Sequence, residues 1–316
     1  MESNKLLAIV IPTYNRADFL DYNLKNHIPI LKEHNIQIFI SDNASTDNTE
    51  NIVKKWMKEY TFLFYSKNEI NIGPDANFEK ALKLPNTNYV WLLGDTSFFN
   101  KIEFNLLLNK IDNNSFDMIV TNSENRVKGI ETIIFTNHND LLTTLGWHMT
   151  QISSLMFSKE LLSKANFSRY YNSNFIQTGI IFEYLSLKSY IEVLWNNDVS
   201  VNLIKLDNIK KESWQNQTFP IWLKNWPNFI FSLPPIYTLE SKELTIKKHN
   251  CLTRIFSLKY LLYLRSYNFY TLNEYLVYNK LLKYSGRKYP KITFLLPLLV
   301  PSFLMKIIRK CFFKGK

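Results

Sequence analysis

The chain contains few cysteines, only Cys251 and Cys311 among its 316 residues. Two cysteines cannot build a disulfide framework, and these two lack metal-ligand spacing, so a reducing compartment is the simplest expectation. The sequence also lacks internal repeats and linkers rich in glycine and serine. We expect no signal peptide, because the apolar run from Leu6 to Ile11 is short and leads directly into a polar motif.

Acidic residues are scarce in the last quarter of the chain. Residues 241–316 hold 16 Lys and Arg but only Glu243 and Glu274, a net charge of +14, whereas residues 1–240 have a net charge of −3. This asymmetry indicates an anionic partner for the last quarter, either membrane phosphate or nucleic acid. We expect no nucleic acid, since no recognised nucleic-acid-binding motif is present.

The uncharged stretch from Ile292 to Met305 is only 14 residues long and contains Pro297 and Pro301. It is therefore too short to span a bilayer. Five basic residues follow it: Lys306, Arg309, Lys310, Lys314 and Lys316. An apolar segment beside a basic cluster suits the membrane interface, so residues 290–316 are expected to bind a membrane surface. The alternative is a helical hairpin packed in a core, with a solvated tail.

The remaining sequence is rich in hydrophobic (46%) and aromatic (15%) residues, which argues against disorder. Short apolar runs at 6–11, 36–41, 61–66 and 89–93 alternate with helical patterns near 17–33, 47–59 and 74–84. This alternation predicts an α/β fold with a mainly parallel sheet, and near-continuous apolar runs are typical of strands covered on both faces. Further strands are predicted at 116–122, 131–136, 152–157 and 191–204, with a helix from Lys159.

From about 242 to 285 the apolar spacing becomes helical. Seven residues are expected along one helix face: Leu244, Cys251, Leu252, Ile255, Leu258, Leu261 and Leu262. We therefore expect an α/β domain over residues 1–240 and a basic helical extension over residues 241–316. An aromatic run over 214–229, from Trp214 to Phe229, either stacks on sugar rings or belongs to the core.

Polar clusters follow the first two apolar runs. Ligands of open α/β sheets bind outside the carboxyl ends of the strands, which is where these clusters would lie. Thr13 and Tyr14 stand at the first of these strand ends, and Asp42, whose carboxylate can accept hydrogen bonds, stands at the second. A turn or cap role is the better interpretation for Asp47 but the poorer one for Asp42.

Four motifs, each at a predicted strand end, resemble those of the inverting glycosyltransferases of family 2, which have the GT-A fold. They are IPTYNR from Ile11 to Arg16, DNASTD from Asp42 to Asp47, NIGPDANFEKAL with Asn71, Gly73 and Asn77, and YVWLLGDTS with Gly94 and Asp95. The resemblance covers roughly residues 5–100 and weakens to about 200. It implies a Rossmann-like, mostly parallel sheet flanked by helices.

The resemblance also implies which residues bind a nucleotide-sugar donor: Pro12, Thr13, Tyr14, Arg16, Asp42, Asn43, Asn71, Gly73, Asn77, Gly94 and Asp95. The expected reaction extends a bacterial surface glycan, such as capsule or lipopolysaccharide, on a lipid-linked acceptor at the cytoplasmic membrane.

Asp95 is the expected ligand of a divalent cation, Mn²⁺ or Mg²⁺, which neutralises the diphosphate leaving group. The family usually supplies two carboxylates here, whereas this chain has Thr96 and Ser97 after Asp95.

Inverting transfer also needs a general base. The family places an acidic residue about 90 positions further on; here the nearest carboxylate is Glu183, with Asp198 as the fallback. An ordinary surface role for Glu183 is the alternative. Trp147, His148 and Gln151 are candidates to face the acceptor, with His148 also a possible metal ligand. The family's second carboxylate after Asp95 and its acidic residue at the position of the base are both missing from this chain. Their absence motivates a second hypothesis, a catalytically inactive GT-A-like scaffold subunit.

Overall fold

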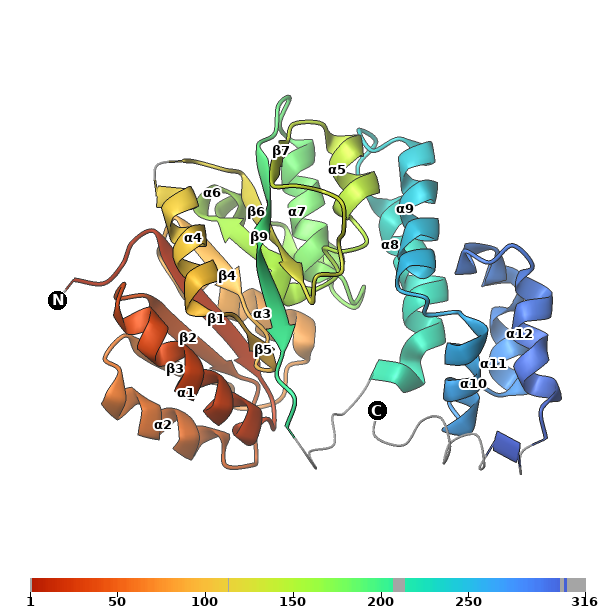
Figure 1. The fold of residues 1–316 in the computed structure, drawn as a ribbon, viewed down its shortest axis with the longest axis horizontal. Coiled ribbons are helices and arrows are strands. Elements are labelled where there is room, and N and C mark those ends of the chain that lie inside the picture. Colours follow the sequence, from red (N-terminus) through yellow and green to blue (C-terminus); the bar gives the residue numbers. More distant parts are fainter. Residues whose placement is uncertain (1, 113, 207–213, 302–303, 306–316) are drawn as a thin grey trace. The chain divides into compact units, whose positions relative to one another are not determined.

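The structure is a computed structural model that describes residues 2–112, 114–206, 214–301 and 304–305. Nine strands of the described part form one sheet in the order β3-β2-β1-β4-β8-β6-β9-β5, with β7 paired to β9 (Figure 1). Their bounds are β1 (Leu7–Thr13), β2 (Gln37–Asp42), β3 (Leu63–Lys67), β4 (Tyr89–Leu92), β5 (Ser97–Phe98), β6 (Met118–Ser123), β7 (Ile133–Phe135), β8 (Leu155–Ser158) and β9 (Val193–Leu203).

The strands β3, β2, β1 and β4 are parallel neighbours, and β8 runs antiparallel between β4 and β6. The mixed, mostly parallel sheet predicted from the sequence is therefore confirmed. Every residue of β1 is buried, as expected for a strand covered on both faces. The predicted strand at 152–157 begins as the short helix η1 (Ile152–Ser154), and the two-residue strand β5 was not predicted.

Seven helices accompany the sheet: α1 (Ala17–Lys32), α2 (Thr49–Glu59), α3 (Pro74–Leu82), α4 (Lys101–Asp112), α5 (His138–Leu145), α6 (Lys159–Lys164) and α7 (Ile176–Ser186), with the short helix η2 (Phe167–Tyr170). Apolar residues of α1, α2 and α4 pack in one core cluster with alternate residues of β1 and β2, for example Leu24 and Phe104 with Ile9 and Ile38. This period-two pattern buries one face of the sheet under these helices.

The remaining helical elements are η3 (Trp214–Gln217), η4 (Pro220–Asn225), α8 (Trp226–Ser232), α9 (Leu239–Leu252), α10 (Leu258–Ser266), α11 (Leu272–Tyr278), η5 (Asn279–Ser285) and α12 (Pro290–Leu299). Residues of η4, α10, η5 and α12 and of the loops beside them form a separate core cluster that includes Phe219, Phe256, Leu261, Tyr270 and Phe294. Phe219 and other members of the aromatic run thus serve packing.

The chain divides into two compact units, Met1–Leu141 with His148–Ile209 and Leu142–Trp147 with Lys210–Lys316. In this division the described residues 214–240 group with the C-terminal helices, and the domain boundary after residue 240 stays a prediction. Among the described residues, no helix combines the length and apolar composition needed to cross a bilayer. The basic residues Lys306 to Lys316 and Cys311 lie outside the described residues.

The single apolar face predicted over 242–285 is wrong. The helix breaks at residues 253–257, between α9 and α10, and Arg254 there has a φ of 54°. Of the seven residues, Ile255 and Leu261 are buried, whereas Leu244, Leu252 and Leu258 are 41%, 54% and 42% exposed. The turn rotates α10 relative to α9, so a continuous 3.6-residue period cannot describe both helices.

Candidate active site

The carboxyl ends of three parallel strands bring together residues from three of the four sequence motifs. Thr13 at the end of β1 pairs in register with Asp42 at the end of β2. The Thr13 hydroxyl Oγ1 donates a hydrogen bond of 2.9 Å to Asp95 Oδ2, just beyond β4. The first, second and fourth motifs thus lie at one edge of the sheet.

The Asp42 carboxylate is fully buried and is held by two neighbours. The Ser45 backbone N–H donates to Oδ1 at 2.8 Å, and the Tyr65 hydroxyl donates to Oδ2 at 2.6 Å. Burial and the hydrogen bond to Asp42 raise the pKa of Tyr65, so its hydroxyl stays protonated and remains a donor. Asp42 therefore fixes both the turn after β2 and the ring of Tyr65, a residue that the sequence reasoning did not single out.

The amide of Asn43 has all its hydrogen bonds within the protein. Its Nδ2 donates to Asn71 Oδ1 at 2.9 Å and to the Gly73 carbonyl at 3.2 Å. Its Oδ1 accepts from Asn68 Nδ2 at 3.0 Å and from the Ile72 N–H at 2.9 Å. A side-chain amide has two donors and two acceptor sites, so Asn43 ties the β3–α3 loop to the end of β2 and has none left for a ligand.

Asn77 and Gly73 complete this amide network at the start of α3. Asn77 accepts from the Ser41 hydroxyl at 2.8 Å and donates to the Ser41 carbonyl at 3.0 Å. Gly73 precedes Pro74 with a φ of 83°, a left-handed conformation that favours glycine. Lys80 donates to Asn68 Oδ1 at 2.6 Å, adding a cation that the sequence reasoning missed.

Hydrogen bonds from Ser153 and Asn23 hold the loop after β4 in place. Ser153 Oγ accepts from the Gly94 N–H at 3.0 Å and lies 2.6 Å from Ser97 Oγ. Asn23 on α1 donates through Nδ2 to the carbonyls of Ser97 at 2.9 Å and Asp95 at 3.3 Å. These bonds fix the backbone that carries the Asp95 carboxylate.

His27 supports Asn23 one helical turn further along α1. Its Nε2 accepts from the Phe99 N–H at 3.2 Å, so Nδ1 carries the proton and donates to Asn23 Oδ1 at 2.9 Å. Burial lowers the pKa of His27 to about 3, and the ring is neutral at physiological pH. Sequence reasoning missed this pair, although polar residues four apart on a buried helix face are a detectable signal.

A divalent cation fits the half-buried Asp95, although not through a cage of side chains. Within the described part of the chain, no three His, Cys, Asp or Glu residues cluster as a metal site. Mg²⁺ and related cations are often held by one or two carboxylates together with substrate phosphates and water. Asp95 is the residue that would hold such an ion, with the diphosphate of a donor supplying further oxygens.

The other residues of the first motif have distinct environments. Pro12 is buried opposite Ser41, and the Tyr14 side chain is 39% exposed beside the site. The Arg16 guanidinium lies 5.7 Å from the centroid of the Phe19 ring. Asp47 Oδ2 accepts from the Ala17 N–H at 3.0 Å, so this carboxylate serves the start of α1.

The residues expected to act on the acceptor are bonded elsewhere. Glu183 Oε1, in the last turn of α7, accepts from Arg169 Nη1 at 3.1 Å. Asp198 on β9 accepts from the Thr132 hydroxyl at 3.0 Å. His148 is fully buried against the Thr121 carbonyl, and burial lowers its pKa to about 3. Each of these three side chains therefore has a partner of its own.

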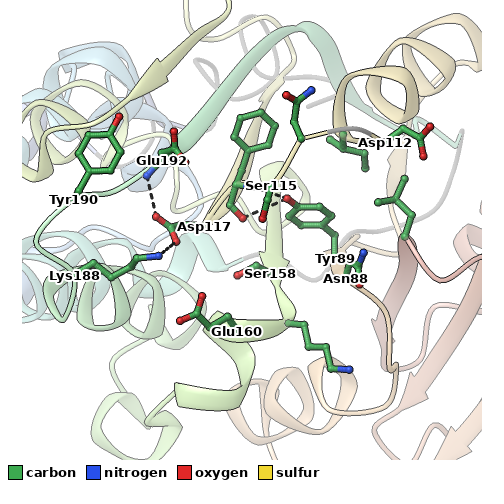
Figure 2. Close-up of a pocket in the computed structure, with 15 residues that line it drawn as sticks. Asn88, Tyr89, Asp112, Ser115, Asp117, Ser158, Glu160, Lys188, Tyr190 and Glu192 are labelled. Carbon is green, nitrogen blue, oxygen red and sulfur yellow. Dashed lines mark hydrogen bonds and ion pairs between the residues drawn. The ribbon is translucent and has the colours of Figure 1, made fainter.

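A cavity of about 480 Å³ lies at the opposite edge of the sheet, where β4, β6 and β9 begin (Figure 2). Asp117 is bonded there to Lys188, to the Tyr184 hydroxyl and to the Glu192 N–H. The charges of Asp117 and Lys188 at the centre of the cavity are thus paired with each other, which is typical of a structural network.

Residues 8–173 match the model of Glycosyl transferase family 2. The chain therefore belongs to this family, which places it among the glycosyltransferase enzymes. It is 31% identical over 184 residues to abequosyltransferase RfbV from Salmonella typhimurium, covering 57% of this chain and 51% of that protein. The chain thus spans about half the length of this curated relative.

Solved structures show the same fold. The TarS fragment 1–349 from S. aureus in complex with UDP-GlcNAc has a TM-score of 0.60 at 14% identity, covering 96% of this chain and 91% of that chain. Mannosyltransferase PcManGT from Pyrobaculum calidifontis, in complex with GDP-Man and Mn²⁺, has a TM-score of 0.56 at 12% identity, covering 99% and 89%. The fold of the chain is accordingly of the GT-A type.

Proposed function

We propose that the chain transfers a sugar from a nucleoside diphosphate donor to a growing bacterial surface glycan on a lipid-linked acceptor, with inversion. The observation that carries the proposal is the hydrogen bond between Thr13 and Asp95, which joins the ends of β1 and β4 beside the end of β2. Support also comes from the relative named as an abequosyltransferase and from structures solved with UDP-GlcNAc or GDP-Man.

In this proposal the donor lies over the ends of β1, β2 and β4. Tyr14 and Asn71 are exposed polar groups at this edge, while Asp42 and Asn43 hold the surrounding loops in place. Asp95 would hold a Mn²⁺ or Mg²⁺ ion, which supplies charge neutralisation for the departing diphosphate when bound. Thr13 fixes the orientation of the Asp95 carboxylate, and Asn23 fixes its backbone.

The donor-site test compares Asp95→Asn with the wild-type chain in hydrolysis of a panel of nucleotide-sugars, with and without Mn²⁺. We expect turnover to fall at least about 100-fold, the magnitude associated with losing a preorganised electrostatic group. Asp112→Asn, at the end of α4 and the opposite sheet edge, is the control. Equal turnover in Asp95→Asn and wild type would remove Asp95 from the mechanism; a chain that binds no donor would instead favour the scaffold hypothesis.

Glu183 is our proposed general base, and it is tested separately. Glu183→Gln should abolish transfer while donor affinity stays unchanged, because the base acts on the acceptor hydroxyl. Glu160→Gln on α6, whose carboxylate pairs with Lys164, is the matched control. Transfer at the wild-type rate by Glu183→Gln would exclude this role.

We further propose that residues 290–316 attach the chain to the inner face of a bacterial membrane. In the described part of this segment, α12 buries Phe294 and Pro297 but leaves Ile292, Leu296 and Leu299 at 60%, 45% and 75% exposed. Such exposed apolar side chains beside cations are typical of helices that lie in a membrane interface.

The attachment test replaces Ile292, Leu296 and Leu299 with Gln and leaves Phe294 in its core. We expect the triple variant to lose sedimentation with anionic vesicles. The control replaces three exposed leucines of α9, Leu239, Leu244 and Leu252, with Gln. Unchanged sedimentation of the α12 variant, or equal loss in both variants, would rule out α12 as the anchor.

A further inference from the structure

A small cavity of about 290 Å³ lies where α9 ends and α10 begins. Arg254 and Lys259 bring two positive charges to its lining, and Thr253, Ser257 and Tyr260 bring hydroxyl groups. None of the residues that line it is acidic. The two cations and the hydroxyl groups among its lining residues therefore favour an anion over a cation.

Local hydrogen bonds hold this lining in place. The Thr253 N–H donates to the His249 carbonyl at 3.0 Å and ends α9. The Ser257 N–H donates to the Arg254 carbonyl at 2.9 Å, and Ser257 Oγ accepts from the Tyr260 N–H at 3.2 Å to cap α10. The backbone that carries the two cations is thus fixed on both sides of the break.

The two acidic residues of the C-terminal quarter are engaged elsewhere. Residues 241–316 contain only Glu243 and Glu274. Glu243 pairs with Lys247 at 3.5 Å, and Glu274 accepts from the Thr271 N–H at 2.9 Å in the capping box of α11. Within the described residues, neither Arg254 nor Lys259 forms an ion pair with a carboxylate. Their charges are available to an external anion.

We propose that this cavity binds the diphosphate group of a lipid-linked acceptor, an inference that rests on the proposed function. The Thr253 hydroxyl donates to the His249 carbonyl at 2.7 Å, so the hydroxyl groups offered to a ligand are those of Ser257 and Tyr260. These hydroxyls and the two cationic side chains suit phosphoryl oxygens, which accept charge-assisted hydrogen bonds. Burial raises the pKa of Tyr260 to about 12, so its phenol stays protonated. The cavity volume of about 290 Å³ lies just below the range of ligand pockets, which starts at about 300 Å³, and so suits a head group better than a complete nucleotide-sugar.

Hydrogen exchange of the full chain with inorganic pyrophosphate, in chelator without divalent cations, tests the site. We expect protection of peptides covering 253–263 in the wild type. The variant Arg254→Gln/Lys259→Gln should bind about 100-fold more weakly, since it loses two charge-assisted hydrogen bonds. Lys280→Gln/Lys291→Gln, with the same charge change at exposed positions of the same unit, is the control and should retain the protection.

A comparison of farnesyl diphosphate with pyrophosphate tests whether the bound diphosphate belongs to a lipid. Tighter protection by farnesyl diphosphate than by pyrophosphate supports a lipid-linked ligand, whereas equal affinity for both overturns the lipid assignment. Absent protection at 253–263, or equal protection in the two double variants, overturns the site itself. Nucleotide-sugar hydrolysis by the wild type reports on the proposed function separately, so an active chain without this protection refutes the cavity proposal alone.

Discussion

Asn23 offers a sharp test of how the Asp95 loop is held, because its amide bridges α1 and the loop after β4. Asn23→Ala removes the acceptor of the buried His27 Nδ1–H and the donor to the buried Ser97 carbonyl. A buried group that loses its partner costs about 1–3 kcal/mol, so two such groups predict a loss of about 2–6 kcal/mol. This is a large part of the 5–15 kcal/mol that stabilises a typical domain.

The matched control is Asn26→Ala on the same helix. The Asn26 amide donates to the Tyr22 carbonyl at 2.7 Å in an exposed position, so its removal should cost under about 0.5 kcal/mol. Because the chain has two units, native-state hydrogen exchange over peptides 17–32 and 91–99 is the suitable assay. We also expect turnover to fall by up to about 100-fold as the loop shifts. Similar exchange in the two variants would refute the bridging role.

Two further perturbations probe the same region. Buried His27 has a pKa of about 3 against 6.5 in an unfolded chain, so its contribution is complete above pH 6.5 and is lost as the pH falls towards 3. This pKa shift predicts that unit 1 is about 2 kcal/mol less stable at pH 5 than at pH 7. Hydrogen exchange at the two pH values checks the difference. The same pH dependence in His27→Gln as in the wild type would contradict the prediction. Gly94→Ala places a Cβ 3.1 Å from Ser97 Oγ and 3.2 Å from Ser153 Oγ, tighter than ordinary contact. Turnover should fall roughly tenfold and recover in part in Gly94→Ala/Ser97→Ala; full activity of the single variant would show that the loop tolerates the shift.

The strands that carry the site could be predicted from local sequence, because their apolar runs identify them without knowledge of long-range contacts. Runs such as Leu7–Thr13 are apolar throughout, and parallel strands covered on both faces are the common explanation of such runs. Once the parallel order was predicted, the convergence of Thr13, Asp42 and Asp95 followed from chain direction. The geometry at this edge agrees with that prediction.

Other features depend on contacts that no local pattern contains. The two-residue strand β5 exists because Ser97 and Phe98 pair with the end of β9, about a hundred residues away. The break at Arg254 carries neither glycine nor proline, so the apolar period continues through it in the sequence. The clamp formed by Ser153 likewise joins residues 56 and 59 positions apart. Tertiary pairing decides the strand β5 and the Ser153 contacts, whereas the break at Arg254 is held by local hydrogen bonds that the apolar period does not reveal.

The hydrogen bonds also separate two roles that a sequence motif merges. Asn43 has used its four hydrogen bonds and Asp42 is fully buried, so in this conformation both act on loops rather than on a ligand. Under the proposed function, a donor would bind to groups that remain accessible at the strand ends, such as the exposed Tyr14 and the half-buried Asp95. The proposed function therefore assigns selectivity for sugar and base to the more exposed side chains around Asp42 and Asn43.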